Sequence, residues 1–222
     1  IEDLVAVYEH NDIPVALAGG EVCCGMPKLD LGDLEAVKKA KETNVPDLAY
    51  WVDMGWDIIA PVPSCTLMFK QELPLMYPDD ADVQKVANAF YDPFEYLAVR
   101  NKEGLLKTDF KKPIGKVSYQ VACHQRVQNI GMKTRDVLNL VPGTEVTAQE
   151  RCSGHDGTYA VKQETHEKSV KIARPVVRKV DQQEPDHFMS ECPMAASHIA
   201  NLSEKLEKAE HPMTLLRMAY GL

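Results

Sequence analysis

The chemistry that this sequence could perform rests on six cysteines, which fall into two similar groups. They are Cys23, Cys24, Cys65, Cys123, Cys152 and Cys192. The interval from Cys24 to Cys65 is nearly equal to the interval from Cys152 to Cys192. Equal spacing of the same residue type in both halves of a chain indicates an internal repeat. We therefore expect two related cysteine sites, one in each half.

Three kinds of chemistry are compatible with these cysteines. Thiolates at helix N-termini are stabilised by the helix dipole and free N–H groups, which lowers their pKa and suits both metal binding and redox reactions. Long spacings suit an iron–sulfur cluster assembled across several loops, whereas zinc remains an alternative, since three cysteines and one histidine form a normal structural site. The adjacent Cys23 and Cys24 are poorly placed to bridge each other, so a thiol–disulfide enzyme acting through this pair is the least favoured hypothesis.

Two histidines lie close enough to cysteines to be considered as metal ligands. His155 follows Cys152 by three positions, and His124 directly follows Cys123. The alternative for either histidine is hydrogen bonding within the loop or support of a ligand from behind. Both stay in the candidate metal-ligand set together with the six cysteines.

The elements that must position these residues are strands alternating with helices. We predict strands over 13–18, 57–62, 117–122, 145–148 and 185–189. We predict helices over 1–10, 33–54 with an interruption at Pro46, 66–73, 83–105, 127–140, 158–180, 194–208 and 212–220. Such alternation predicts an α/β fold with small parallel sheets flanked by helices. Because the carboxyl ends of parallel strands share one edge of a sheet, we expect the cysteine loops to gather there.

The repeat predicts two pseudo-symmetric halves, 1–112 and 113–222. The second half contains three units of strand, cysteine loop and helix, whereas the first contains two and begins with a helix. We therefore expect that a strand ending in a cysteine precedes Ile1 and that the sequence is a piece of a longer protein.

Composition narrows the class of protein. The formal net charge of −8 argues against nucleic acid as the main partner, because phosphate binding needs a basic surface. No apolar run approaches the length of a membrane span. Six cysteines in 222 residues do not make a small disulfide scaffold. We expect a cytoplasmic protein whose association with the inner face of the membrane would go through a partner.

Five short motifs carry a resemblance to a known family. They read CCGMP, PSC, ACHQR, RCSGHDGT and SECP and begin at residues 23, 63, 122, 151 and 190. In this order the chain resembles the duplicated cysteine-rich CCG domain, which occurs in the B subunit of heterodisulfide reductase and in the C subunit of anaerobic glycerol-3-phosphate dehydrogenase. The resemblance implies two α/β halves, iron–sulfur clusters between strand ends, and electron transfer together with other subunits of a redox complex.

Several positions depart from the pattern of that family. Met68, Ser153 and Ala195 stand where the family has cysteine, so at most three cysteines remain in each half. Heterodisulfide reduction is therefore not supported, and a [4Fe-4S] cluster in the second half needs a fourth ligand, for which His124 and His155 are the nearest candidates. We predict an iron–sulfur electron-transfer subunit of an oxidoreductase complex rather than an independent catalyst. The alternative is a non-redox structural or interaction module with a zinc or vestigial metal site.

Overall fold

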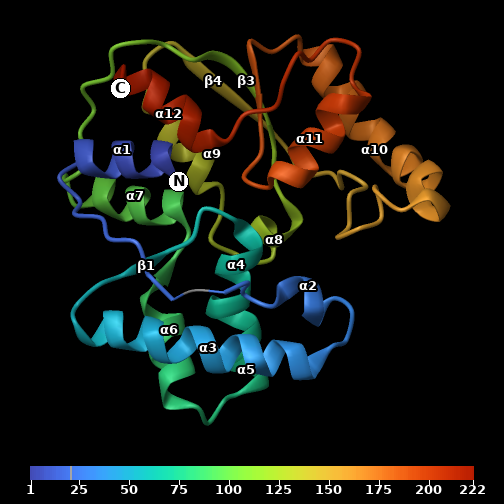
Figure 1. Cartoon of the computed structure of the whole chain (residues 1–222). Helices are drawn as coiled ribbons and strands as arrows, with labels where there is room; N and C mark the ends of the chain where they lie inside the picture. The colour runs from blue at the N-terminus through green and yellow to red at the C-terminus, as the bar shows by residue number, and fades with distance from the viewer. Residues whose placement is uncertain (21) are drawn as a thin grey trace. The chain divides into compact units, whose positions relative to one another are not determined.

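Two compact units make up the fold in the computed structural model, which describes residues 1–20 and 22–222 (Figure 1). One unit comprises residues 15–96, and the other is discontinuous in sequence, with residues 1–14 and 97–222. Each unit has a small parallel sheet flanked by helices, so the predicted α/β class is confirmed.

The discontinuous unit is built on a three-stranded sheet in the order β4-β3-β5. The strands are β3 (Gly115–Gln120), β4 (Thr144–Gln149) and β5 (His187–Met189), and both pairings are parallel. Val117 on β3 is in register with Val146 on one side and with His187 on the other. The strands predicted over 117–122, 145–148 and 185–189 are therefore confirmed to within three residues at each end.

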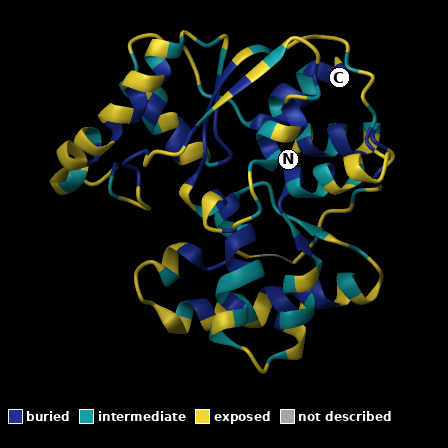
Figure 2. Ribbon diagram, turned by 180° about the vertical axis from the view of Figure 1, so that it is seen from behind, coloured by how far each residue is buried: buried dark blue, intermediate teal, exposed yellow. Residues whose placement is uncertain are grey.

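Helices flank this sheet. The helices of this unit are α1 (Glu2–His10), most of α7 (Pro93–Lys102), α8 (Cys123–Arg126), α9 (Lys133–Leu138), α10 (Gln163–Gln183), α11 (Pro193–Leu202) and α12 (Pro212–Tyr220). Val176 and Val180 of α10 and Ile199 of α11 pack around Phe188 of β5. The ribbon coloured by burial shows the inner faces of these helices buried and their outer faces exposed (Figure 2). Amphipathic helices on a sheet require this arrangement.

Helix α1 closes this unit by packing on α12. The Asp3 carboxylate accepts hydrogen bonds from Thr214 and, at 2.6 Å, from Nη1 of Arg217. Asn11 accepts a hydrogen bond of 2.8 Å from the backbone N–H of Lys107. Tyr220 donates to the carbonyl of Lys107 at 2.6 Å. The first fourteen residues therefore belong structurally with residues 97–222.

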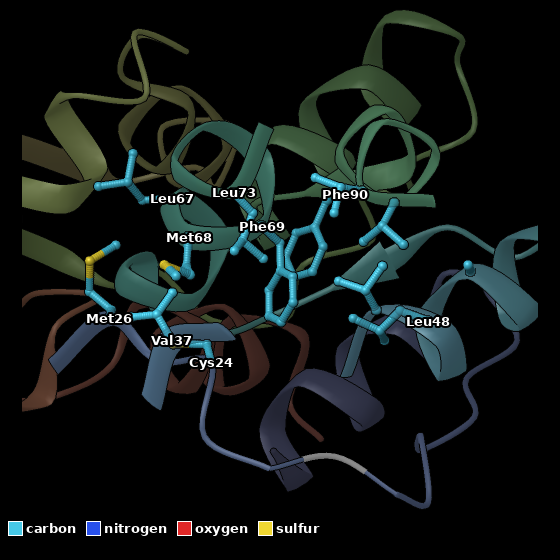
Figure 3. Close-up of a cluster of buried hydrophobic side chains, with 13 residues drawn as sticks. Cys24, Met26, Val37, Leu48, Leu67, Met68, Phe69, Leu73 and Phe90 are labelled. Atoms are coloured by element: carbon cyan, nitrogen blue, oxygen red, sulfur yellow. The ribbon is translucent and has the colours of Figure 1, made fainter. Parts of the chain in front are cut away.

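The 15–96 unit has a two-stranded parallel sheet of β1 (Ile58–Ile59) and β2 (Phe90–Tyr91). Its helical segments are α2 (Met26–Leu29), α3 (Leu34–Asp53), α4 (Pro63–Leu67), the π-helix η1 (Met68–Glu72), α5 (Leu73–Met76) and α6 (Ala81–Ala89). The core contains the stacked rings of Phe69 and Phe90, with centroids 5.1 Å apart, together with Leu48 and Leu73 (Figure 3).

The strand predicted over 13–18 is not formed. These residues have no regular secondary structure and lie in neither sheet. Pro14 has no N–H to donate, and Leu17 is 68% exposed, so most of this run is neither paired nor buried, although Ile13 at its start is buried. None of the described residues between α1 and the cysteine pair therefore lies in a strand.

Three helix predictions were also wrong. The interruption predicted at Pro46 is absent, because α3 runs without a break through Pro46, which lies on the exposed face of the helix. The helix predicted over 83–105 is instead α6, β2 and α7. The side chain of Asp92 accepts hydrogen bonds from the N–H groups of Phe94 (2.9 Å) and Glu95 (3.1 Å). Asp92 therefore caps the start of α7, and the predicted helix is interrupted there. The helix predicted over 66–73 lies within the continuous helical stretch α4–η1–α5, whereas of the helix predicted over 127–140 only α9 is formed.

Candidate functional site

Three cysteines meet at the carboxyl edge of the β4-β3-β5 sheet. Cys123 begins α8 after β3, Cys152 follows β4, and Cys192 precedes the first residue of α11 after β5. The Cys123 thiol hydrogen-bonds to the sulfur of Cys152 and lies within electrostatic range of Cys192. The parallel sheet therefore gathers these three thiols, as the alternation of strands and helices predicts.

The acidity of Cys123 differs from the expectation for a helix N-terminus. Cys123 is exposed as a residue, but desolvation of its thiol by the surrounding protein raises its pKa, and the neighbouring charge of Cys152 and the hydrogen bond to it act in the same direction. The positive charge of Arg126 acts in the opposite direction but does not outweigh these effects. Helix α8 has only four residues, so its dipole offers little compensation. Without a bound cation, Cys123 is therefore a protonated thiol over a wide pH range.

The loop that carries Cys152 is fixed from behind by α10. The N–H of Gly154 donates to Sγ of Cys152 at 3.3 Å. Oγ of Ser169 donates to the carbonyl of Gly154 at 2.6 Å and accepts from Nε2 of His198 at 2.8 Å. Gly154 has φ of +75°, and a Cβ there would lie 2.3 Å from the Ser169 carbonyl oxygen, so only glycine fits. The sequence analysis did not identify Ser169 and His198 as residues that support the Cys152 loop, because both are distant from that loop in the chain.

His155 is buried beside this loop. Its side chain is 8% exposed, and its ring centroid lies 6.4 Å from that of His198. Burial lowers the pKa of His155, so the imidazole is neutral at neutral pH. A neutral imidazole is the form that binds metals. His124 is half-buried on α8. Metal ligation by either histidine stays a prediction.

A second group of three thiols lies in the 15–96 unit. Cys23 is exposed, Cys24 is buried and Cys65 is half-buried. The Cys24 thiol donates a hydrogen bond to the sulfur of Cys65, which raises the pKa of Cys24 and lowers the pKa of Cys65. Cys23 hydrogen-bonds to Cys24, and the N–H of Met26 also donates to the Cys24 sulfur. The structure therefore brings these three predicted residues together.

Apolar side chains surround this second group. Cys24 is 7% exposed and belongs to the same buried cluster as Met26, Val37 and Met68 (Figure 3). Met68 is fully buried, and its terminal methyl lies 3.7 Å from the position that a Cβ on Gly25 would occupy. Gly25 has φ of +92°, which favours glycine at this close approach of α3 and η1.

The donor sets suit an iron–sulfur cluster better than a single metal ion. Within residues 1–20 and 22–222, no three His, Cys, Asp or Glu side chains are arranged to hold one ion. An iron–sulfur cluster instead distributes its thiolates over several irons and gains hydrogen bonds from backbone N–H groups to sulfur. Each unit offers three neighbouring thiols and a backbone N–H donor, from Gly154 or Met26, so the residues present fit such a cluster.

Two stretches of the chain match a known protein family. The family model for the CCG cysteine-rich domain matches residues 2–70 and 117–200, which is more than half of the chain. The chain belongs to the CCG cysteine-rich domain family. The two matched CCG regions include all six cysteines, so the family assignment and the two thiol groups rest on the same parts of the chain.

Curated relatives share the CCG region at moderate identity. The C subunit of anaerobic glycerol-3-phosphate dehydrogenase from Escherichia coli (strain K12) is 29% identical over 221 residues, covering 98% of this chain and 54% of the relative. The B subunit of fumarate reductase (CoM/CoB) from Methanothermobacter marburgensis is 28% identical, covering 98% of this chain and 42% of the relative. Lactate utilization protein A from Oceanobacillus iheyensis is 26% identical, covering 80% and 70%. The chain thus spans about half the length of the first two.

No helix within residues 1–20 and 22–222 combines the length and the apolar character needed to cross a bilayer.

Proposed function

We propose that this chain is an iron–sulfur electron-transfer subunit of an oxidoreductase complex. The observation that carries the proposal is the meeting of Cys123, Cys152 and Cys192 at one sheet edge, with the N–H of Gly154 donating to a cysteine sulfur. Hydrogen bonds from backbone N–H groups to cluster sulfurs are one of the ways in which a protein sets a reduction potential.

The three cysteines of the discontinuous unit would hold the cluster, which supplies one-electron transfer when bound. A [4Fe-4S] cluster needs a fourth ligand, and His155 and His124 are the candidates. The lowered pKa of His155 supports its candidacy, because no proton has to leave the imidazole before it binds a metal. The raised pKa of Cys123 means that cluster assembly releases a proton from this thiol.

The second thiol group would form a related site in the first half of a duplicated chain, with halves 1–112 and 113–222. Cys23, Cys24 and Cys65 neighbour one another, and the thiol of Cys24 already shares its proton with Cys65. Two matches to one family model support the duplication.

The names of the relatives suggest the setting of this activity. Two are named as subunits, one of a dehydrogenase and one of a reductase. We propose that this chain likewise passes single electrons between a dehydrogenase partner and an acceptor, and that any membrane association goes through those partners. The formal net charge of −8 supports protein rather than nucleic-acid partners.

One observation favours a second candidate function, a non-redox interaction module with a zinc or vestigial site. Cys24 is part of an apolar core, and the fully buried Met68 stands at a family cysteine position. Met68 packs as an ordinary core residue, as expected where a metal site has been lost.

Metal analysis of protein purified without oxygen separates the two candidates. We expect iron and acid-labile sulfide in equal amounts, roughly four of each per cluster, with visible absorbance that bleaches on reduction. The Cys152→Ala variant should lose this cluster, whereas the control variant Thr158→Ala, at an exposed residue six positions further along the chain, should keep it. Zinc alone, or no metal at all, would contradict the electron-transfer proposal and favour the interaction module.

A further inference from the structure

We infer that Gln120 is a positioning residue that ties together the three cysteine loops of the discontinuous unit. Its effect on a bound cluster rests on the function proposed above, but its effect on the loops does not. Gln120 is the last residue of β3, and its side chain is fully buried.

The Gln120 amide uses its donors and its acceptor on three different segments. Its Nε2 donates to the carbonyl of Val121 at 2.9 Å and to the carbonyl of Arg151 at 3.0 Å. Its Oε1 accepts from Oγ of Ser190 at 2.9 Å. One side chain therefore hydrogen-bonds beyond the ends of all three strands of the sheet.

Each of these partners adjoins a cysteine of the site. Val121 precedes Cys123 by two residues, and Arg151 directly precedes Cys152. Ser190 precedes Cys192 by two residues, and its Oγ also accepts from the Cys192 N–H at 3.4 Å. The Gln120 amide thus fixes the backbone next to every cysteine of the group.

The chemistry of the amide explains why glutamine occupies this position. Its NH₂ group can donate twice while its oxygen accepts, whereas a carboxylate could not donate to the two carbonyls. A methionine has a similar shape but would leave buried polar groups without partners, which destabilises the loops. Buried ties of this kind hold the residues of a site in position before a cofactor binds.

Hydrogen exchange of the reduced, cluster-free protein tests the tie without any cluster. In Gln120→Met, the backbone amides near Cys123, Cys152 and Cys192 should exchange faster together, by about tenfold or more. Ser190→Ala removes one link only, so the effect should be confined to the loop of Cys192. This milder variant keeps the test decisive if Gln120→Met does not fold.

Gln149→Met is the matched control. Gln149 is also a buried glutamine at the end of a strand, it is in register with Gln120, and no side-chain hydrogen bond is seen for it among the described residues. The Gln149→Met variant should leave the backbone amides of the three loops protected from hydrogen exchange. If the loop amides of Gln120→Met exchange as slowly as those of Gln149→Met, the role of Gln120 is refuted. If Gln120→Met does not fold, the same comparison is made with Ser190→Ala at the Cys192 loop.

The cluster-loaded protein gives the second readout. At equal iron and sulfide content, Gln120→Met should shift the midpoint reduction potential and the electron paramagnetic resonance spectrum relative to Gln149→Met. An unchanged potential and spectrum would overturn the role in the cluster, even if exchange is faster. If the parent protein binds no cluster, the proposed function fails, while hydrogen exchange still decides whether Gln120 ties the loops.

Discussion

Replacing Gly154 by alanine tests whether the Cys152 loop depends on its close approach to α10. The left-handed backbone at φ of +75° costs an alanine about 1 kcal/mol or slightly more. The new Cβ would also lie 2.3 Å from the Ser169 carbonyl oxygen and 3.2 Å from the Ala173 nitrogen, both backbone atoms of a helix. Forcing these apart adds about 1–3 kcal/mol. We therefore expect Gly154→Ala to lower the free energy of unfolding by about 3 kcal/mol.

Gly157 provides the matched control for this prediction. It has φ of +61° but no atom within 4 Å of the position that a Cβ would take, so Gly157→Ala should cost only the backbone strain, about 1 kcal/mol. Urea unfolding of the reduced, cluster-free protein, followed by circular dichroism, measures both. With a slope of about 2 kcal/mol per molar, the midpoint should fall by about 1.5 M for Gly154→Ala and by about 0.5 M for Gly157→Ala. Equal shifts would refute the reasoning, because strain alone would then explain both.

Two further predictions concern the accessibility of two thiols and the partly exposed Asp3 carboxylate. In reduced, cluster-free protein, a maleimide should label Cys23 at least about tenfold faster than Cys24, which is 7% exposed and has a pKa raised by its hydrogen bond to Cys65 and by burial. Mass spectrometry measures the two rates, which should become equal in urea; equal rates in the folded protein would contradict the burial of Cys24. Asp3→Asn should cost up to about 1 kcal/mol at pH 7, because the pair with Arg217 is partly exposed and screened by water. The pKa of Asp3 is lowered in the folded state, so this stability is present above pH ~4 and disappears as the pH falls through the lowered value. Urea titrations at several pH values measure it, and a cost that persists at low pH would contradict the assignment.

The sheet of the discontinuous unit was predictable from the sequence because a strand-forming stretch stands shortly before each of its cysteines and a helical pattern separates one stretch from the next. The run at 13–18 is more apolar than these stretches and yet is unpaired, with Ala16 and Leu17 exposed, since nothing local to it reveals whether a neighbouring strand is available. Pro14 was the one local warning against a strand there.

Other features depended on contacts that are not local. Asp92-Pro93 is a recognisable helix start, and reading it would have divided the helix predicted over 83–105. Ser169 supports Gly154 from fifteen residues away, and Gln120 reaches Ser190 across seventy residues. Such pairings require the folded sheet, so spacing alone predicts the cysteine sites but not the polar residues that fix them.

The pairing of α1 with α12 has a consequence for the order in which the protein folds as it is synthesised. The partners Asp3 and Arg217 are 214 positions apart, and the entire 15–96 unit lies between them in the chain. On the ribosome, residues 15–96 have all their partners as soon as that stretch has emerged, whereas α1 must wait for α12. Domains generally fold as units, the N-terminal one first. Here α1 should instead join its unit only once α12 has emerged, after the nested unit has folded.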